Sequence, residues 1–212
     1  ADFAAGHLFV SGAEKTASGK TVTVIRDETI LLEALEEAAI PAKYVSRRSS
    51  ARGTLIFESR KTQTMIQGVD FSRERYLQDR MTLLAGSFEA MSDRQGLILS
   101  EPTARKLGME LGDRVLLQLA TITGQQNVGE LALAAIAPDS GLLSGFSAYA
   151  NASYLNELLD MGDSEYMQLG LYLPSLDGMD RYADRLAAEL GLRANVKERK
   201  KAEGMEGAMA SH

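Results

Sequence analysis

The 212-residue chain contains no cysteine. Disulfide bonds, zinc–thiolate sites and thiol nucleophiles are therefore excluded, although this absence is compatible with either the cytoplasm or the periplasm. Histidine is scarce, because only His7 and His212 occur, and a lone histidine cannot form a metal site or a catalytic triad without partners. No G-x-S-x-G motif is present. The sequence therefore predicts no catalytic residue, no cofactor site and no metal site.

Long apolar runs are also missing. No stretch of about 18 apolar residues occurs, so no segment predicts a membrane-spanning helix. The opening residues, ADFAAGHLFVSG, lack the basic end and the long apolar stretch of a signal peptide. The chain starts without methionine and finishes in a polar tail rich in glycine, methionine and alanine, residues 204–212. We expect the tail to be flexible and both ends to be those of a domain excised from a longer protein.

The composition is that of a globular protein, with 45% hydrophobic and 25% charged residues. The length suits one large domain or two small ones. The formal net charge is -6, which argues against a general affinity for nucleic acid.

The two ends of the chain show similar strand–helix–strand patterns. At the first end, residues 7–11 and 21–25 predict strands joined by the polar segment 12–20, and a helix follows with Asp27 as its cap and Pro41 after its end. At the other end, residues 166–173 predict a strand, a helix closes at Gly191, and residues 193–197 predict a last strand. The apolar stripes of the two helices are Ile30, Leu31, Ala34, Leu35 and Ala38, and Met179, Tyr182, Ala183, Leu186, Ala187 and Leu190.

The middle of the chain is richer in strands. Residues 42–58 and 62–69 predict long strands, and the run RRSSARG within the first predicts a bulge or bend. Residues 114–122 and 126–136 predict a hairpin. The remaining signals are a helix from the N-cap Ser100 to Gly108, a short strand at 147–150, and a helix capped by Asn151 that carries Tyr154, Leu155, Leu158 and Leu159.

These patterns predict an α+β fold with two lobes. Residues 1–76 and 164–203 are expected to form a discontinuous lobe, in which the two strand–helix–strand units pack their helices on one face of a shared sheet in a ferredoxin-like arrangement. Residues 77–163 are expected to form an inserted, strand-rich α+β lobe.

Residues 96–113, GLILSEPTARKLGMELGD, carry an ordered pattern of strand, short capped helix and tight turn. The helix begins as S-x-x-x-A-x-K-L-G and the turn continues as x-x-G-D-x-V. Segments 66–70 (IQGVD) and 83–88 (LLAGSF) precede the pattern, and 148–151 (AYAN) follows it. The positions that match are Ser100, Ala104, Lys106, Leu107, Gly108, Gly112, Asp113 and Val115.

In order and spacing, these segments resemble the extracytoplasmic core domain of FtsX-like and MacB-like ABC transporter permeases, which include the lipoprotein-releasing permeases. The resemblance covers about residues 65–190. Ser87 stands where the family usually has arginine, and residues 12–20 match no pattern of the family. In physical terms Gly108 lets the backbone leave a helix, and the turn at Gly112 and Asp113 aims Val115 into the core.

The resemblance implies a periplasmic or extracellular domain mounted on transmembrane helices, with no active site of its own. It implies a second permease copy and a cytoplasmic ABC ATPase as partners, and a lipoprotein, periplasmic or outer-membrane partner beyond the membrane. The domain would couple ATP hydrolysis to export, lipoprotein release or activation of an envelope partner. A free-standing periplasmic binding or adaptor protein is the alternative.

A loop rich in apolar residues is the candidate partner site. Leu142, Leu143 and Phe146 lie in or beside the glycine-bounded segment 140–145, and an exposed apolar loop can dock a partner. The alternative, which we favour, is that these side chains fill the core of their own lobe. Met161 and Met167 pose the same choice, and core filling is again favoured.

Three further signals receive structural interpretations. Residues 19–21 (GKT) end like a phosphate-binding loop, but the β-branched run that follows predicts a strand where such a loop needs a helix. Glu36 and Glu37 lie on the polar side of their helix. The first basic cluster, interpreted as a surface patch or a charged strand edge, consists of Arg47, Arg48 and Arg52. The second, interpreted as a solvated stalk, consists of Lys197, Arg199, Lys200 and Lys201.

Overall fold

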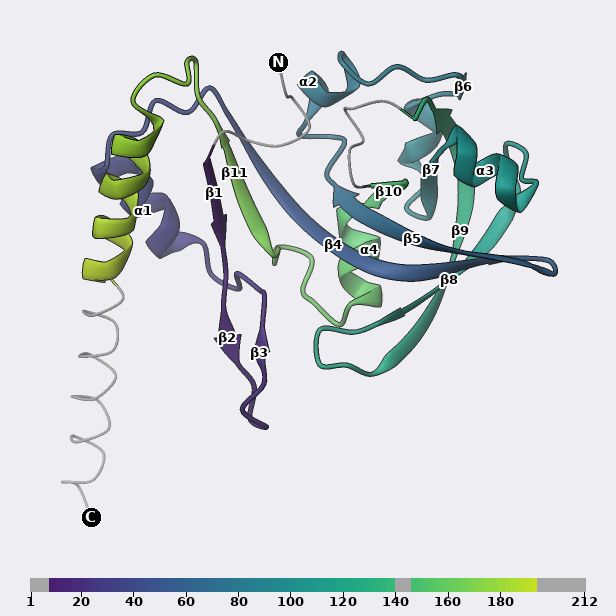
Figure 1. Ribbon diagram of the computed structural model, residues 1–212, viewed down its shortest axis with the longest axis horizontal. Helices are drawn as coiled ribbons and strands as arrows, with labels where there is room; N and C mark the ends of the chain where they lie inside the picture. The colour runs from purple at the N-terminus through teal and green to yellow at the C-terminus, as the bar shows by residue number, and fades with distance from the viewer. Residues whose placement is uncertain (1–7, 140–145, 194–212) are drawn as a thin grey trace. The chain divides into compact units, whose positions relative to one another are not determined.

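The computed structural model describes residues 8–139 and 146–193 (Figure 1). The chain divides into two compact units, Ala1–Arg26 with Val45–Leu171, and Asp27–Tyr44 with Tyr172–His212. We call the first the barrel unit and the second the helical unit. These boundaries differ from the lobes expected from the sequence, because strands on both sides of residue 77 pair within one sheet.

The barrel unit contains a nine-stranded sheet whose order is β1-β11-β4-β5-β10-β7-β9-β6, with β8 paired to β4 and β9. A separate two-stranded sheet joins β2, which lies within the segment 12–20 expected to be a polar link, to β3, which begins the strand predicted at 21–25. The strands are β1 (Leu8–Ser11), β2 (Glu14–Lys15), β3 (Thr21–Val22), β4 (Tyr44–Phe57), β5 (Arg60–Val69), β6 (Ala85–Gly86), β7 (Gly96–Ser100), β8 (Arg114–Ala120), β9 (Gln126–Ala137), β10 (Ala148–Asn151) and β11 (Gln168–Tyr172).

The double pairing of β8 closes a ring in the order β4, β5, β10, β7, β9, β8 and back to β4. Leu55 of β4 stands opposite Leu117 of β8 at the closure. Gly53 permits the close approach there, because a Cβ at this position would lie 2.6 Å from Cδ1 of Leu117. A closed ring leaves none of its strands with a free hydrogen-bonding edge along the paired stretches.

Two apolar clusters lie on opposite faces of the ring. Leu97 and Leu99 belong to the cluster that the ring surrounds, whereas Ile98 between them belongs to the outer one. The pairing of β9 shifts register between Leu133 and Ala135. The odd-numbered residues of β9 therefore change from the inner cluster (Leu131, Leu133) to the outer one (Ala135, Ala137).

Two short helices of the barrel unit, α3 and α4, lie where the sequence predicted helices. Helix α3 (Glu101–Leu107) follows its N-cap Ser100 and ends at Gly108, whose φ of 70° is left-handed, so both predicted boundaries are confirmed. Helix α4 (Ala152–Leu158) follows Asn151, and its four predicted apolar residues are buried. The other helices of the barrel unit are α2 (Arg75–Gln78) and the 3₁₀ turn η1 (Glu89–Ser92).

The helical unit contains α1 (Thr29–Glu37) and a helix over residues 179–193. The prediction that Asp27 caps α1 is wrong by one residue, because the N-cap is Glu28; Oδ1 of Asp27 accepts a hydrogen bond of 2.9 Å from the backbone N of Thr29. The prediction that Gly191 ends the second helix is wrong, because the helix continues through Arg193, which forms an ion pair of 2.6 Å with Glu33 of α1. The strand predicted at 193–197 is therefore wrong at its first residue, and the rest lies outside the described residues.

Two further expectations are corrected. Strand β4 pairs with β5 without a register shift from Ser49 to Phe57, so the bulge, one of the two predicted possibilities, is absent over these residues, while the bend stays a prediction. Arg48 does not belong to a charged edge, because it is buried, whereas Arg52 is exposed. The fold is α+β as predicted, and the ferredoxin-like grouping stays a prediction. None of the helices formed by residues 8–139 and 146–193 is long and apolar enough to cross a bilayer.

Candidate functional site

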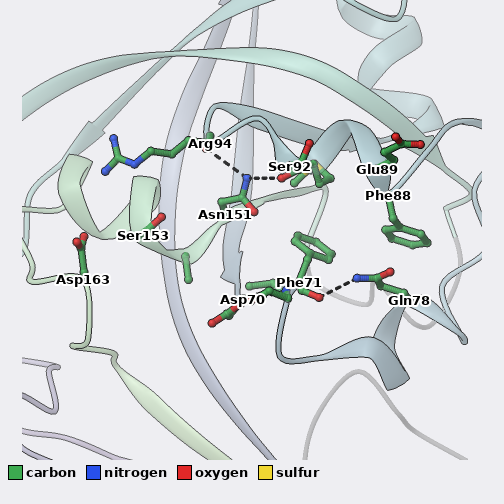
Figure 2. A pocket seen from close by; sticks show the side chains of 14 residues that line it. Asp70, Phe71, Gln78, Phe88, Glu89, Ser92, Arg94, Asn151, Ser153 and Asp163 are labelled. Carbon is green, nitrogen blue, oxygen red and sulfur yellow. Dashed lines mark hydrogen bonds between the residues drawn. The ribbon is translucent and has the colours of Figure 1, made fainter.

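A groove of about 500 Å³ opens on the barrel unit beside the ends of β5 and β10 (Figure 2). These two strands are parallel, with Val69 opposite Asn151, so their carboxyl ends meet at one place. Val69 and Asp70 leave β5 there, and Asn151 leads from β10 into α4. The opposite wall comes from the segment around η1, which contributes Phe88 and Met91.

The apolar part of the groove belongs to the outer cluster. Phe71 and Met91 are buried at 5% and 4% exposure, and Phe88 is half-buried. The ring centroids of Phe71 and Phe88 lie 6.1 Å apart with planes tilted by 38°, a favourable geometry for an aromatic pair. Of these three side chains, Phe88 therefore offers the accessible apolar surface, while Phe71 and Met91 are almost fully buried.

Asn151 holds the two walls together. Its side-chain Nδ2 donates hydrogen bonds to the backbone oxygens of Met91 at 2.9 Å and Arg94 at 3.3 Å (Figure 2), and to that of Asp93 at 2.9 Å. On the other side, Nε2 of Gln78 donates to the backbone oxygen of Phe71 at 2.7 Å. The walls are fixed by hydrogen bonds from side chains to backbone.

The charged residues of the groove are three acids and one base. Asp70 accepts hydrogen bonds from Ser72 and lies 3.4 Å from the guanidinium of Arg73. The only base in the groove lining, Arg94, is an ion-pair partner of Glu157, and its guanidinium carbon lies 5.3 Å from the ring centroid of Tyr154. The other two acids are Glu89 and Asp163.

Glu89 and Asp163 are exposed, and neither forms an ion pair or hydrogen bond within the described part of the chain. Their charges are therefore available to a bound molecule. The groove as a whole has an excess of negative charge.

A buried ion pair lies behind the segment that connects β5 to α2. The guanidinium of Arg48 on β4 contacts both carboxylate oxygens of Glu74, and the hydroxyl of Tyr76 donates to Glu74 Oε2 at 3.0 Å. The two charged side chains are 7% and 5% exposed. Because Asp70 and Phe71 lie in the same segment, this pair fixes one end of the groove to the barrel.

A second charged link lies in the barrel unit outside the groove. Nε of Arg26 donates to Glu14 Oε2 at 2.7 Å, and its Nη1 donates to Glu165 at 3.1 Å. The pKa of Arg26 is raised above its ordinary value, mainly because of the hydrogen bond to Glu14, while desolvation acts in the opposite direction. Arg26 therefore joins the β2–β3 hairpin to the segment before β11.

The candidate partner residues are only in part described. Leu142 and Leu143 lie outside the described residues. Phe146 is half-buried, its ring centroid lies 6.3 Å from that of Tyr149, and it packs against the outer cluster that contains Phe71. Docking of a partner by this loop stays a prediction.

The other sequence signals lie apart from the groove. Strand β3 follows Lys20, so no helix N-terminus is present to hold a phosphate. Met161 is buried and Met167 packs against the inner cluster, which favours core filling, and Glu36 and Glu37 are exposed. No group of three or more metal-ligating side chains occurs within residues 8–139 and 146–193. His7, His212 and the second basic cluster lie outside these ranges.

The groove itself was missed by sequence reasoning, although a signal for it was present. Three of the family-like segments end at it, through Asp70, Phe88 and Asn151. The sequence patterns identify each segment separately. Only the parallel pairing of β5 with β10 shows that the ends of these two strands lie side by side.

Comparison with known proteins gives a likeness of fold. No protein-family model and no curated protein sequence matches the chain. The crystal structure of the extracellular domain of the noncanonical ABC-type transporter YknZ from Gram-positive bacteria matches with a TM-score of 0.56 and 14% identity, covering 88% of this chain and 93% of that one. The periplasmic region of MacB from Actinobacillus actinomycetemcomitans matches with a TM-score of 0.50 and 14% identity, covering 86% and 83%. The resemblance drawn from the sequence is thus confirmed as a shared fold, that of extracellular and periplasmic domains of ABC transporters.

Proposed function

We propose that this chain is the extracytoplasmic domain of an ABC transporter permease and works on the outer face of the cytoplasmic membrane. The observation that carries the proposal is the likeness to the YknZ domain, which extends over 88% of this chain and 93% of that one. Its partners are transmembrane helices of its own polypeptide, a second permease copy and a cytoplasmic ABC ATPase. The chain itself is not an enzyme, and ATP hydrolysis belongs to the ATPase.

We propose a mechanical role for the barrel unit. Its closed ring of paired strands around an apolar cluster resists deformation, because strands cannot slide without breaking pairing on both sides. Motion that starts at the ATPase can therefore be passed on by this body to export a substrate, release a lipoprotein or activate an envelope partner.

The gene sequence around the chain tests the placement. A membrane-spanning helix encoded before Ala1 and three encoded after His212 are expected. Hydrophilic sequence on both sides would instead favour a free-standing periplasmic binding or adaptor protein.

Labelling in cells tests the side of the membrane. Because the chain lacks cysteine, Ser59→Cys in the exposed turn between β4 and β5 gives a single reactive thiol in this domain. A membrane-impermeant maleimide is expected to label it in intact cells, after removal of other cysteines from the full protein. Labelling only after cell lysis would overturn the placement.

The mechanical role is tested on the full transporter with its ATPase in proteoliposomes. An environment-sensitive fluorophore on Ser59→Cys is expected to change its signal when ATP and Mg²⁺ are added, and to stay unchanged with an ATPase variant that cannot hydrolyse ATP. A constant signal during active hydrolysis would contradict the mechanical role.

A further inference from the structure

We propose that the groove beside β5 and β10 binds a short extended protein segment in which apolar side chains stand between two basic ones. The observations that carry this are a preformed cavity, the half-buried ring of Phe88 within it, and two exposed carboxylates of its lining, Glu89 and Asp163.

The apolar surface accepts the middle of the segment. Phe71 and Met91 are anchored in the outer cluster, and Phe88 is half-buried and completes an aromatic pair with Phe71. A leucine or phenylalanine side chain placed on this surface loses contact with water without requiring the groove to rearrange.

The charges select basic flanking residues. Arg94, the base of the groove lining, is committed to Glu157 and lies over the ring of Tyr154. Glu89 and Asp163 lack such partners among the described residues. An anionic ligand would therefore meet net negative charge, whereas lysine or arginine meets two available carboxylates.

The placement of these carboxylates indicates an extended segment rather than a compact molecule. In Figure 2, Asp163 and Glu89 lie on opposite sides of Phe71. A segment with two basic residues separated by apolar ones can place one basic residue beside each carboxylate. The groove is also preformed, because the bonds of Asn151 and Gln78 fix its walls.

The proposal is tested on the isolated chain by titration with blocked synthetic peptides. Ser92→Cys carries an environment-sensitive fluorophore at the groove, and Ser59→Cys carries it far along the chain as a reference; both serines are exposed. The peptide AKALAKA, whose leucine and two lysines lie on the same face of an extended chain, is expected to change the signal at position 92 in a saturable way and to leave position 59 unchanged.

Two control peptides separate the apolar and the ionic contributions. AEALAEA replaces both lysines by glutamate, and AKASAKA replaces the leucine by serine. Each is expected to bind at least about tenfold more weakly than AKALAKA. Equal binding by either one, or no saturable response to AKALAKA up to millimolar concentration, would overturn the proposal.

Protein variants locate the contact. Glu89→Gln with Asp163→Asn is expected to weaken binding by about three- to tenfold, because each exposed charge pair contributes modestly. Glu36→Gln with Glu37→Gln makes the same change in net charge on exposed residues of α1 and is expected to have no effect. Equal weakening by both pairs would show general attraction to an acidic protein and contradict a groove-specific site. The titration does not depend on where the chain works in the cell. A failed titration would therefore not contradict the proposed function, and a failed test of the proposed function would not contradict peptide binding in the groove.

Discussion

Arg48 and Glu74 form an ion pair that is almost completely removed from water, with side chains 7% and 5% exposed. Strand β4 carries the arginine, and the glutamate lies just before α2. Such a pair contributes little net stability, but removal of one partner leaves the other charge buried without compensation.

Arg48→Met is therefore expected to lower the free energy of unfolding by about 3–5 kcal/mol. Addition of Glu74→Gln is expected to restore much of this loss, because the buried charge disappears while the amide oxygen can still accept from Tyr76. Urea unfolding followed by circular dichroism measures both. Arg52→Met on the same strand is the control, because Arg52 is exposed, and its effect should stay within about 0.5 kcal/mol. A double variant less stable than Arg48→Met would contradict this explanation.

The ion pair also shows why sequence reasoning failed at this place. Three arginines close together on a strand predict an exposed basic patch, and the pattern of β4 does not identify which of them meets a carboxylate 26 residues later. In contrast, the signals for α3 and for the β8–β9 hairpin are local, since an N-cap serine, a left-handed glycine and alternating leucines all act within a few residues. Those elements were predicted almost to the residue.

Closure of the ring and formation of the groove both depend on contacts between distant residues. Leu55 meets Leu117 only because β4 is long enough to pair with β5 and β8 at once. The convergence of Asp70, Phe88 and Asn151 likewise requires the parallel pairing of β5 with β10. Local propensity contains no information on such pairings, which is why the lobe boundaries differ although the long strands β4, β5, β8 and β9 lie close to their predicted ranges.

Asn151 is expected to be important for the shape of the groove and for stability. Asn151→Ala removes three hydrogen bonds to backbone oxygens and should lower the free energy of unfolding by about 1–3 kcal/mol. Asn151→Asp should lower it further, because a carboxylate would face those same oxygens. Thermal unfolding gives the order of the variants. Asn127→Ala loses two bonds, the one to Leu158 O and the one that its Oδ1 accepts from the backbone N of Val128, and should cost less; if it costs as much, the three-bond explanation fails.

Gly86 has a structural reason to be glycine. Its φ is +78°, and a Cβ would collide with the backbone oxygen of Ala134, at the register shift of β9. Gly86→Ala should therefore destabilise the protein clearly more than Gly112→Ala, whose φ is +89° but whose Cβ would meet no atom within 4 Å. The second change should cost about 1 kcal/mol from backbone conformation alone. Equal losses in urea unfolding would mean that the contact with Ala134 has no importance.

Leu117 tests whether the closed ring is a main source of stability. Its side chain is completely buried at the closure between β4 and β8, whereas the neighbouring Leu116 is 43% exposed on the other face of β8. Leu117→Ala removes buried methyl groups and leaves a cavity, so it should lower the free energy of unfolding by about 2–5 kcal/mol. Leu116→Ala should change it by less than about 1 kcal/mol. Hydrogen exchange adds a local measurement: in Leu117→Ala the backbone amides of β8 that pair with β4 should exchange faster, because Leu117 lies within this four-residue pairing, Gly53–Ile56 with Leu116–Leu119. Uniform acceleration over the whole barrel unit would instead show that the ring unfolds as one cooperative body.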